Sequence, residues 1–223
     1  MGKNTRDPEQ LYRIDGKNVF CEVMASGLGI DKVCINFVEY NVAGQRGSRI
    51  KNSIGFYMPV YTAKRLSLDI LSGRIAAMGK AAKRKAAEAG QQYAKAVFEQ
   101  IGGTPSKFAK DGIPVARSFT ITPGASQPWI LCAKQGTGHE TKEGLIVMDK
   151  CEATIRVPTS NDIMKELAVA LGTAFDIWTQ LRFVPVVAPM MQEANAKRQQ
   201  AIDAKKVESS SAFNAADAYY NQR

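Results

Sequence analysis

A passage in the first half of the chain recurs in looser form about a hundred residues later. The first copy, RIKNSIGFYMPVYTAKRLSLDIL, covers residues 49–71, and the second, EATIRVPTSNDIMKELAVALG, covers residues 152–172. At one constant offset the following pairs coincide: Phe56 with Ile155, Met58 with Val157, Pro59 with Pro158, Leu68 with Leu167, Ile70 with Val169, and Gly73 with Gly172. A unit that occurs twice usually cannot bury its apolar face alone. We therefore expect the two copies to pack against each other.

Length and composition set the size of the core that these copies can build. A chain of 223 residues with 45% hydrophobic content is enough for one large domain or two small halves. No apolar run approaches the length that spans a bilayer, and the polar start MGKNTRDPEQ lacks the apolar core of a signal peptide. We expect a cytoplasmic protein with no membrane partner.

Cysteine and histidine are placed in a way that argues against several kinds of chemistry. The four cysteines form no CxxC pair, and His139 is the single histidine. A zinc site at the usual spacing and a Ser-His-Asp or Cys-His mechanism are therefore both disfavoured. The glycines of Gly136–Gly138 lack the ending of a P-loop, and Glu140 and Glu143 belong to a polar hairpin. We predict reduced cysteines, no cofactor, no metal and no enzyme activity.

Alternating apolar and polar residues predict four strands before the first helix, at 11–14, 18–25, 32–40 and from Lys51 to Val60. In the fourth, every second residue from Ile54 to Val60 is apolar and is expected to face the core. Tyr57 then stands on the open face of the sheet, beside Tyr40.

Helical patterns follow each set of strands. A helix starts near Thr62, and an alanine-rich basic segment continues it from Arg74 to Gln100. After a loop, strands are predicted at 118–122, 129–134, 145–148 and 153–157. An apolar helix over 162–183 follows, and Pro185 and Pro189 are expected to end it.

These elements predict an α+β fold of two ββββα repeats, with antiparallel sheets packed by helices, an extra basic helix and a C-terminal helical tail. The predicted boundaries are a flexible N-terminal tail at 1–9, a first repeat with its basic extension at 10–103, a linker at 104–115, a second repeat at 116–189, and a polar helical or disordered tail at 190–223.

The net charge of +9 is unevenly distributed. Residues 1–110 hold 18 Lys or Arg against 9 Asp or Glu, whereas residues 111–223 hold 12 of each. This asymmetry indicates a polyanionic partner, most often nucleic acid. Basic residues that only solubilise a helix explain the charge count equally well.

Exposed aromatic residues between basic ones are typical of proteins that bind single-stranded nucleic acid, because a positive groove holds the backbone and flat side chains stack on bases. The candidate residues are Tyr40 and Tyr57 for stacking, and Arg46, Arg49, Lys51, Lys64, Arg65, Lys83, Arg84 and Lys85 for the backbone. Strand aromatics more often pack in cores, so the cluster carries this prediction more than any one tyrosine.

Two copies of four strands and a helix resemble the Pur-alpha repeat and the plant Whirly proteins. The resemblance covers roughly residues 10–183 as topology, and RIKNSIGFYMPVYTAKRLSLDIL looks like the end of a Pur repeat. In those families single-stranded DNA or RNA lies across the strands, and the modules often dimerise. The resemblance therefore implies a single-stranded nucleic-acid-binding protein of little sequence specificity, with DNA favoured over RNA. The basic helix from Arg74 departs from the pattern.

Two alternatives remain open at this point. A structural or assembly protein could form a homo-oligomer, a dimer or larger, through the apolar helix 162–183, with the basic helix docking an acidic partner. An enzyme would need a deep pocket lined by polar groups, and no sequence pattern predicts one.

Overall fold

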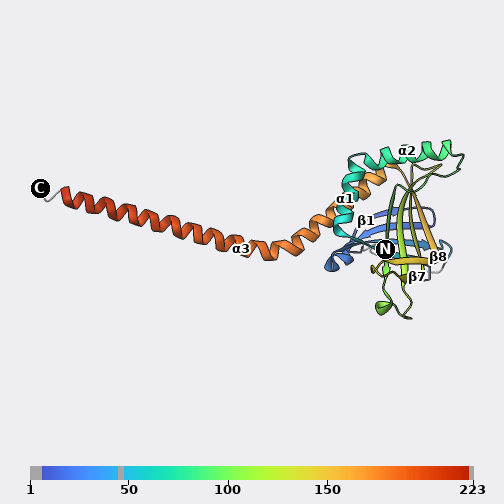
Figure 1. Ribbon diagram of the computed structural model, residues 1–223, viewed down its shortest axis with the longest axis horizontal. Helices are drawn as coiled ribbons and strands as arrows, with labels where there is room; N and C mark the ends of the chain where they lie inside the picture. The colour runs from blue at the N-terminus through green and yellow to red at the C-terminus, as the bar shows by residue number, and fades with distance from the viewer. Residues whose placement is uncertain (1–6, 45–47, 221–223) are drawn as a thin grey trace, which may run out of the picture. The chain divides into compact units, whose positions relative to one another are not determined.

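The computed structural model describes residues 7–44 and 48–220, with side chains described up to residue 203. It divides into two units, Met1–Trp178 and Thr179–Arg223. Two four-stranded antiparallel sheets lie in the first unit (Figure 1). The predicted α+β arrangement of two ββββα copies is confirmed.

The first sheet has the strand order β1-β2-β3-β4. Its strands are β1 (Gln10–Asp15), β2 (Val19–Met24), β3 (Lys32–Tyr40) and β4 (Ile50–Pro59), with a 3-10 turn, η1 (Ala25–Ile30), between β2 and β3. Helix α1 (Val60–Leu71) follows β4 without an intervening residue, and α2 (Arg74–Glu88) follows α1. Gly73 allows the chain to change direction between the two helices, because its φ of 80° lies in the left-handed region that favours glycine.

The second sheet has the order β5-β6-β7-β8. Its strands are β5 (Phe98–Thr104), β6 (Val115–Pro123), β7 (Trp129–Glu140) and β8 (Ile146–Thr159), with a 3-10 turn, η2 (Ser106–Phe108), after β5. The segment 104–115 therefore joins β5 to β6 within one sheet. Helix α3 (Asn161–Tyr220) starts after β8 and continues into the second unit.

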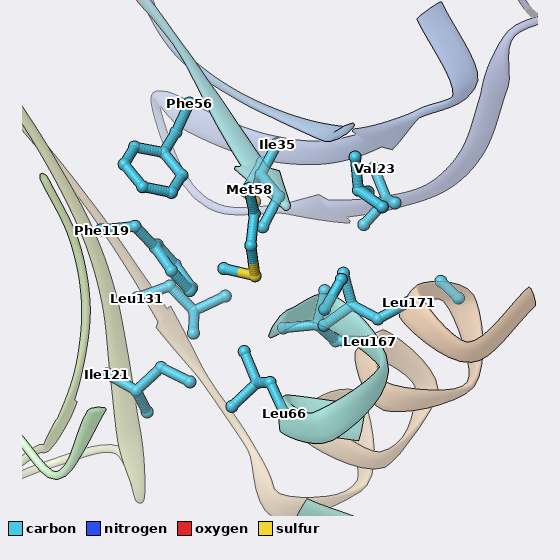
Figure 2. Close-up of a cluster of buried hydrophobic side chains, with 14 of the residues drawn as sticks. Val23, Ile35, Phe56, Met58, Leu66, Phe119, Ile121, Leu131, Leu167 and Leu171 are labelled. Carbon is cyan, nitrogen blue, oxygen red and sulfur yellow. The ribbon is translucent and has the colours of Figure 1, made fainter. Parts of the chain in front are cut away.

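Both sheets and the helices share one core (Figure 2). Met58 and Phe56 of β4 meet Phe119 of β6, whose ring centroid lies 5.9 Å from that of Phe56. Leu66 of α1 and Leu167 of α3 close the core from the helical side, and both are fully buried. Each such leucine contributes roughly 1.5–3 kcal/mol of burial free energy. Strand alternation in β4 was predicted correctly, since Ile54, Phe56 and Met58 are all buried; Val60 is buried too, but it is the first residue of α1 and not the end of the strand.

The two copies correspond at two offsets, not one. In the strands the predicted pairs Phe56–Ile155 and Met58–Val157 are buried alike. In the helices the predicted pairing is wrong, because Leu68 is 57% exposed whereas Leu167 is fully buried. An offset of 101 residues instead matches the buried helix positions: Ala63 with Met164, Leu66 with Leu167, Ser67 with Ala168, and Ile70 with Leu171. Two extra residues precede α3, where Ser160 Oγ accepts a hydrogen bond from Ile163 N at 3.2 Å.

The helices of the two copies touch at equivalent positions. Ser67 Oγ donates a hydrogen bond to the carbonyl oxygen of Ala168 at 2.6 Å, and both residues are buried. Because 67 and 168 are equivalent at the offset of 101, each copy packs its helix against that of the other. This arrangement fulfils the expectation that neither copy buries its apolar face alone.

Three predicted elements differ from the observed ones. The helix predicted from Arg74 to Gln100 ends at Glu88, and β5 lies where its end was expected. The segments predicted as two strands at 145–148 and 153–157 are one strand, β8. Pro185 and Pro189 do not end α3, which continues to Tyr220. Each proline removes one backbone hydrogen bond, and the helix continues despite these losses.

Candidate nucleic-acid interface

Tyr57 stands on the outer face of the first sheet, as predicted. Its side chain points away from the core because its neighbours in β4, Phe56 and Met58, point inward. It is 44% exposed. Its hydroxyl hydrogen-bonds to Cys34. The pKa of Tyr57 is raised because an ionised Cys34 would repel a phenolate beside it, and because the ring is partly buried. The phenol therefore stays neutral and presents a flat, uncharged ring.

Tyr40 lies at the other end of the same strand pair. Tyr57 is opposite Cys34 and Tyr40 is opposite Ile50 in the register of β3 and β4, so six residues of β3, about 20 Å, separate them. The expectation that Tyr57 stands beside Tyr40 is wrong. Tyr40 is partly buried against Phe20, at 5.9 Å between ring centroids. The two tyrosines therefore do not form one stacking platform.

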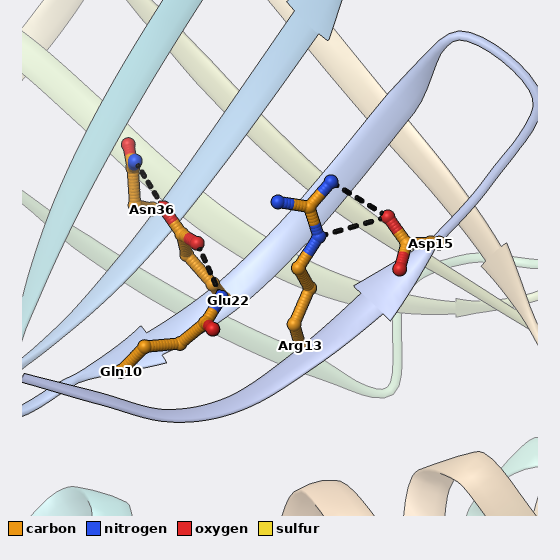
Figure 3. A network of polar contacts seen from close by, with 5 residues as sticks. All are labelled: Gln10, Arg13, Asp15, Glu22 and Asn36. Atoms are coloured by element: carbon orange, nitrogen blue, oxygen red, sulfur yellow. Dashed lines mark hydrogen bonds and ion pairs between the residues drawn. The ribbon is translucent and has the colours of Figure 1, made fainter. Parts of the chain in front are cut away.

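A polar network fills the sheet face toward β1 (Figure 3). Glu22 accepts hydrogen bonds from Gln10 Nε2 at 2.7 Å and from Asn36 Nδ2 at 2.9 Å. Arg13 pairs with Asp15 at 2.8 Å. The carboxylate of Glu22 has amide partners but makes no ion pair within the described residues, so this part of the face repels phosphate. On the first sheet, residues that could bind an anion lie at the margins, in the β3–β4 hairpin and in α1.

The cations of the β3–β4 hairpin are mostly engaged within the protein. Lys51 pairs with Glu39 at 2.8 Å, and its hydrogen bond is the main cause that lowers the pKa of Glu39. Arg49 is exposed, and its Nε donates to the carbonyl oxygen of Gly44 at 2.9 Å. Arg46 lies outside the described residues. Arg49 and Lys51 are the two predicted cations of this hairpin that the structure describes, and of these Arg49 makes no ion pair with a carboxylate.

Of the two predicted cations in α1, one is paired with a carboxylate and the other is not. Lys64 pairs with Asp176 of α3 at 3.2 Å and lies over the ring of Phe175, so it joins α1 to α3. Arg65 is exposed and forms no ion pair in the part of the chain that the structure describes. Arg65 is thus the one of this pair that is available to a ligand.

Helix α2 carries the largest group of unneutralised cations. Lys83, Arg84 and Lys85 are exposed, and among the described residues only Arg84 has an acidic neighbour, Glu88, at 3.8 Å. The helix docks on the second sheet through Gly79, where an added Cβ would lie 2.5 Å from the Trp129 ring. Lys83 lines a hollow together with Pro123, Gly124 and Ala125, so this part of α2 lies beside the β6–β7 turn.

Two hollows flank the chain where it leaves α2. One, of about 280 Å³, is lined by Lys83, Tyr93 and Gly124 among others, and the other, of about 440 Å³, by Lys85 and Lys95. Tyr93 is 66% exposed. The sequence did not single out Tyr93 and Lys95 as site residues, because both were expected in a basic helix or helix pair hinged at Gly79 or Gly90. The signal was the run Gly90-Gln91-Gln92, which interrupts the alanine-rich pattern.

A third, smaller hollow of about 100 Å³ lies where β4 meets β5, and Tyr57, Lys32 and Arg117 line it. Sequence reasoning missed both cations. Arg117 was detectable in principle, because it shares the inward-facing set of β6 with Phe119 and Ile121. An arginine in such a set needs a polar partner or a ligand.

The described residues contain no cluster of three or more His, Cys, Asp or Glu side chains that could hold a metal ion. None of the helices, over the described part of the chain, is long and apolar enough to cross a membrane.

No family model and no curated protein matches this chain. Among solved structures it is similar to the Whirly proteins WHY1 and WHY3 from Arabidopsis thaliana. WHY1 is 13% identical, with a TM-score of 0.46 over 85% of this chain and 94% of the other. WHY3 is 11% identical, with a TM-score of 0.46 over 86% and 99%. The likeness is a weak one of fold and agrees with the predicted resemblance.

Proposed function

We propose that this protein binds single-stranded nucleic acid, DNA ahead of RNA, with little sequence specificity. The observation that carries the proposal is the charge of α2 and the loop after it. Between Arg74 and Lys95 the chain has six Lys or Arg and one acidic residue. Four of these cations make no ion pair within the described residues: Lys80, Lys83, Lys85 and Lys95. A polyanion relieves this local repulsion and releases its own counterions on binding.

Exposed tyrosines supply the second requirement. Tyr93 lies among Lys83 and its neighbours, and Tyr57 lies at the margin of the first sheet. A base that stacks on such a ring contributes roughly 1–3 kcal/mol whatever its identity. Stacking needs unpaired bases, because the bases of a duplex are already stacked on one another. The proposal therefore names a single strand, and its low specificity follows from the sequence tolerance of stacking.

The predicted residues contribute unequally in this proposal. Lys83, Arg84, Lys85, Arg49 and Arg65 supply backbone contacts, and Arg46 belongs with them by its place in the sequence. Tyr57 supplies stacking, and Tyr40 borders the sheet face. Lys51 and Lys64 have carboxylate partners within the chain, so their contribution requires those exposed pairs to open. Such pairs are worth only about 0–1 kcal/mol, which a phosphate can replace.

The test is fluorescence anisotropy with labelled single-stranded DNA, duplex DNA and RNA of equal length, each over a salt series. We expect the order single-stranded DNA, RNA, duplex. We also expect log K to fall with log salt at about 0.7 per phosphate contact. Absent binding at low ionic strength, or binding that ignores salt, overturns the proposal.

A matched pair of triple variants locates the interface. The changes K83E, K85E and K95E reverse three charges around Tyr93, whereas K17E, K142E and K150E reverse three exposed charges elsewhere. The first variant is expected to lose about a hundredfold in affinity at low salt, because three contacts become repulsive. An equal loss in both variants shows that only total charge matters and contradicts this location.

Self-association is a second candidate function, and exposed apolar residues in the second unit favour it. The predicted interface, the apolar face of 162–183, is largely occupied, because Leu167, Leu171 and Trp178 are buried in the chain's own core. Apolar side chains that remain exposed further along α3 are Leu181, Val184, Val186, Val187, Met190 and Met191. Sedimentation of the wild type and of a variant with L181E and V184E tests this. A homo-oligomer that dissociates in the variant supports assembly through α3, and a monomeric wild type at micromolar concentration contradicts it.

A further inference from the structure

The two sheets meet at a seam between β4, an edge strand of the first, and β5, an edge strand of the second. The hollow of about 100 Å³ lies in this seam and receives Tyr57 and Lys32 from the first copy and Arg117 from the second. Its volume suits a compact tetrahedral anion and is too small for a nucleobase with its sugar. It is thus formed jointly by the two copies.

Arg117 is a positive charge that lacks a carboxylate partner. Its Nε donates to Gln135 Oε1 at 2.7 Å and its Nη1 to Thr104 Oγ1 at 2.9 Å. No carboxylate lies within ion-pair distance of it in the described part of the chain. Burial lowers the pKa of Arg117 below its ordinary value, although a guanidinium stays charged at neutral pH. Buried charges are usually paired, and this partly buried one has neutral hydrogen-bond partners only, so an anion that enters the hollow would neutralise it.

The hydrogen bonds to Gln135 and Thr104 also orient the guanidinium. The two hydrogen bonds use the N–H of Nε and one N–H of Nη1, and the remaining N–H groups of the guanidinium stay available. A planar guanidinium can bind two oxygens of a phosphate through two parallel hydrogen bonds. Lys32, at the start of β3, lines the same hollow and makes no ion pair among the described residues. Gly103 also lines the hollow, and it lets β5 lie close to β6, because an added Cβ would lie 2.2 Å from the carbonyl oxygen of Val115.

Strand β5 connects the seam to the basic end of α2. The chain passes from Lys95 beside Tyr93 to Gly102 at the seam in seven mostly extended residues, about 23 Å. A single strand that follows β5 therefore meets cations and an exposed tyrosine at both ends. Tyr57, at the mouth of the seam, is in position to stack on a base next to a phosphate held below it.

We propose that the seam is a phosphate-binding site in which Arg117 and Lys32 hold one phosphodiester of a bound single strand, with the ring of Tyr57 against an adjacent base. This proposal rests on the proposed function and specifies where the strand crosses from one copy to the other.

The test combines three single variants with two measurements. R117Q removes the charge but keeps an amide that can bond to Gln135 and Thr104, K32Q removes the second cation at the mouth, and K83Q is the control on α2. Anisotropy with a 20-nucleotide oligothymidylate should show about a tenfold loss for R117Q, a smaller loss for K32Q, and a salt slope lower by about 0.7 in each. Circular dichroism verifies folding, and K32Q keeps the test valid if R117Q fails to fold.

The second measurement follows the Nε–H signal of Arg117 by NMR, assigned by its loss in R117K. We expect it to shift with thymidine 5′-monophosphate and with the oligonucleotide, and to stay unmoved with thymidine. If inorganic phosphate shifts the signal but the oligonucleotide does not, the seam holds free anions and the strand assignment is overturned.

The outcomes separate this inference from the proposed function. If K83Q weakens binding while R117Q and K32Q bind like wild type and the Arg117 signal does not move, the seam proposal is wrong and the proposed function stands. If wild type binds no oligonucleotide at all, the proposed function fails and the assignment of a strand phosphate fails with it.

Discussion

The two copies of the ββββα unit are alike in the core and unlike at the surface. Their helices bury matching positions, and Ser67 of the first touches Ala168 of the second, its equivalent. After the helix they diverge: the first copy continues into α2, which carries exposed lysines, whereas the second continues into the remainder of α3. The scaffold is therefore repeated in the two copies, whereas the surface that we assign to binding lies largely in the segment between them.

The largest expected effect tests whether the copies are equivalent in the core. L66A and L167A remove matching, fully buried leucines, and each should cost about 2–5 kcal/mol in the free energy of unfolding. L68A, on the exposed side of α1, should cost less than about 1 kcal/mol. Urea unfolding followed by circular dichroism measures all three. A large loss in L68A with a small one in L66A contradicts the offset of 101 residues in the helices.

The next effect tests how the basic helix is attached to the second sheet. In G79V the new side chain would collide with Trp129, and the free energy of unfolding should fall by about 1–3 kcal/mol. Valine is no worse than glycine in a helix, so propensity cannot cause this loss. A77V, at an exposed position of the same helix, is the control. If G79V is as stable as A77V and its tryptophan emission is unchanged, α2 does not dock on Trp129.

A smaller effect tests the contact between the equivalent helices. S67A removes the buried hydroxyl that donates to Ala168, and should cost about 0.5–1.5 kcal/mol. S72A removes an exposed hydroxyl at the end of the same helix and is expected to be neutral within about 0.5 kcal/mol. Thermal unfolding of both variants measures the difference. Equal stability in the two would show that the contact contributes nothing.

The smallest perturbation is chemical labelling, which distinguishes the copies by their cysteines. Both cysteines of the first sheet, Cys21 and Cys34, are buried, whereas the second sheet has one buried, Cys132, and one exposed, Cys151. Burial raises the pKa of each of the three buried thiols, so less thiolate forms at a given pH and the reagent is also excluded. At pH 8, iodoacetamide should modify Cys151 alone, and all four in urea. Rapid native labelling of Cys21, read by mass spectrometry, contradicts the packing of the first sheet.

Strand alternation made much of the first copy predictable. β3 was predicted at its observed bounds, and the inward set of β4 was identified residue by residue, because one face of each strand is apolar without interruption. Strand β5 was not predictable by the same logic. Its sequence FEQIGGT has a glycine pair and follows an alanine-rich run, so local propensity opposes the strand that pairing with β6 imposes.

The candidate site was predictable only in part, because charge counts do not reveal which charges are neutralised. Lys51 and Lys83 look alike in the sequence, yet Lys51 pairs with Glu39 across β3 and β4 while Lys83 stays unpaired in the described structure. The partner depends on strand register, which no local pattern encodes. Arg117 and Tyr57 are sixty residues apart and from different copies, and their meeting in the seam follows from the packing of the two sheets.

Photo-crosslinking tests the central claim most directly, because it reports which side chains lie against the bases of a bound strand. An oligothymidylate that carries 5-bromodeoxyuridine would be irradiated with the full-length protein, and the crosslinked peptides identified by mass spectrometry. The account predicts crosslinks to the peptides that contain Tyr57 and Tyr93, which lie at the two ends of β5, and their loss in the variant with K83E, K85E and K95E. Crosslinks confined to residues of the second unit, or none in a complex that anisotropy shows to be saturated, would contradict it.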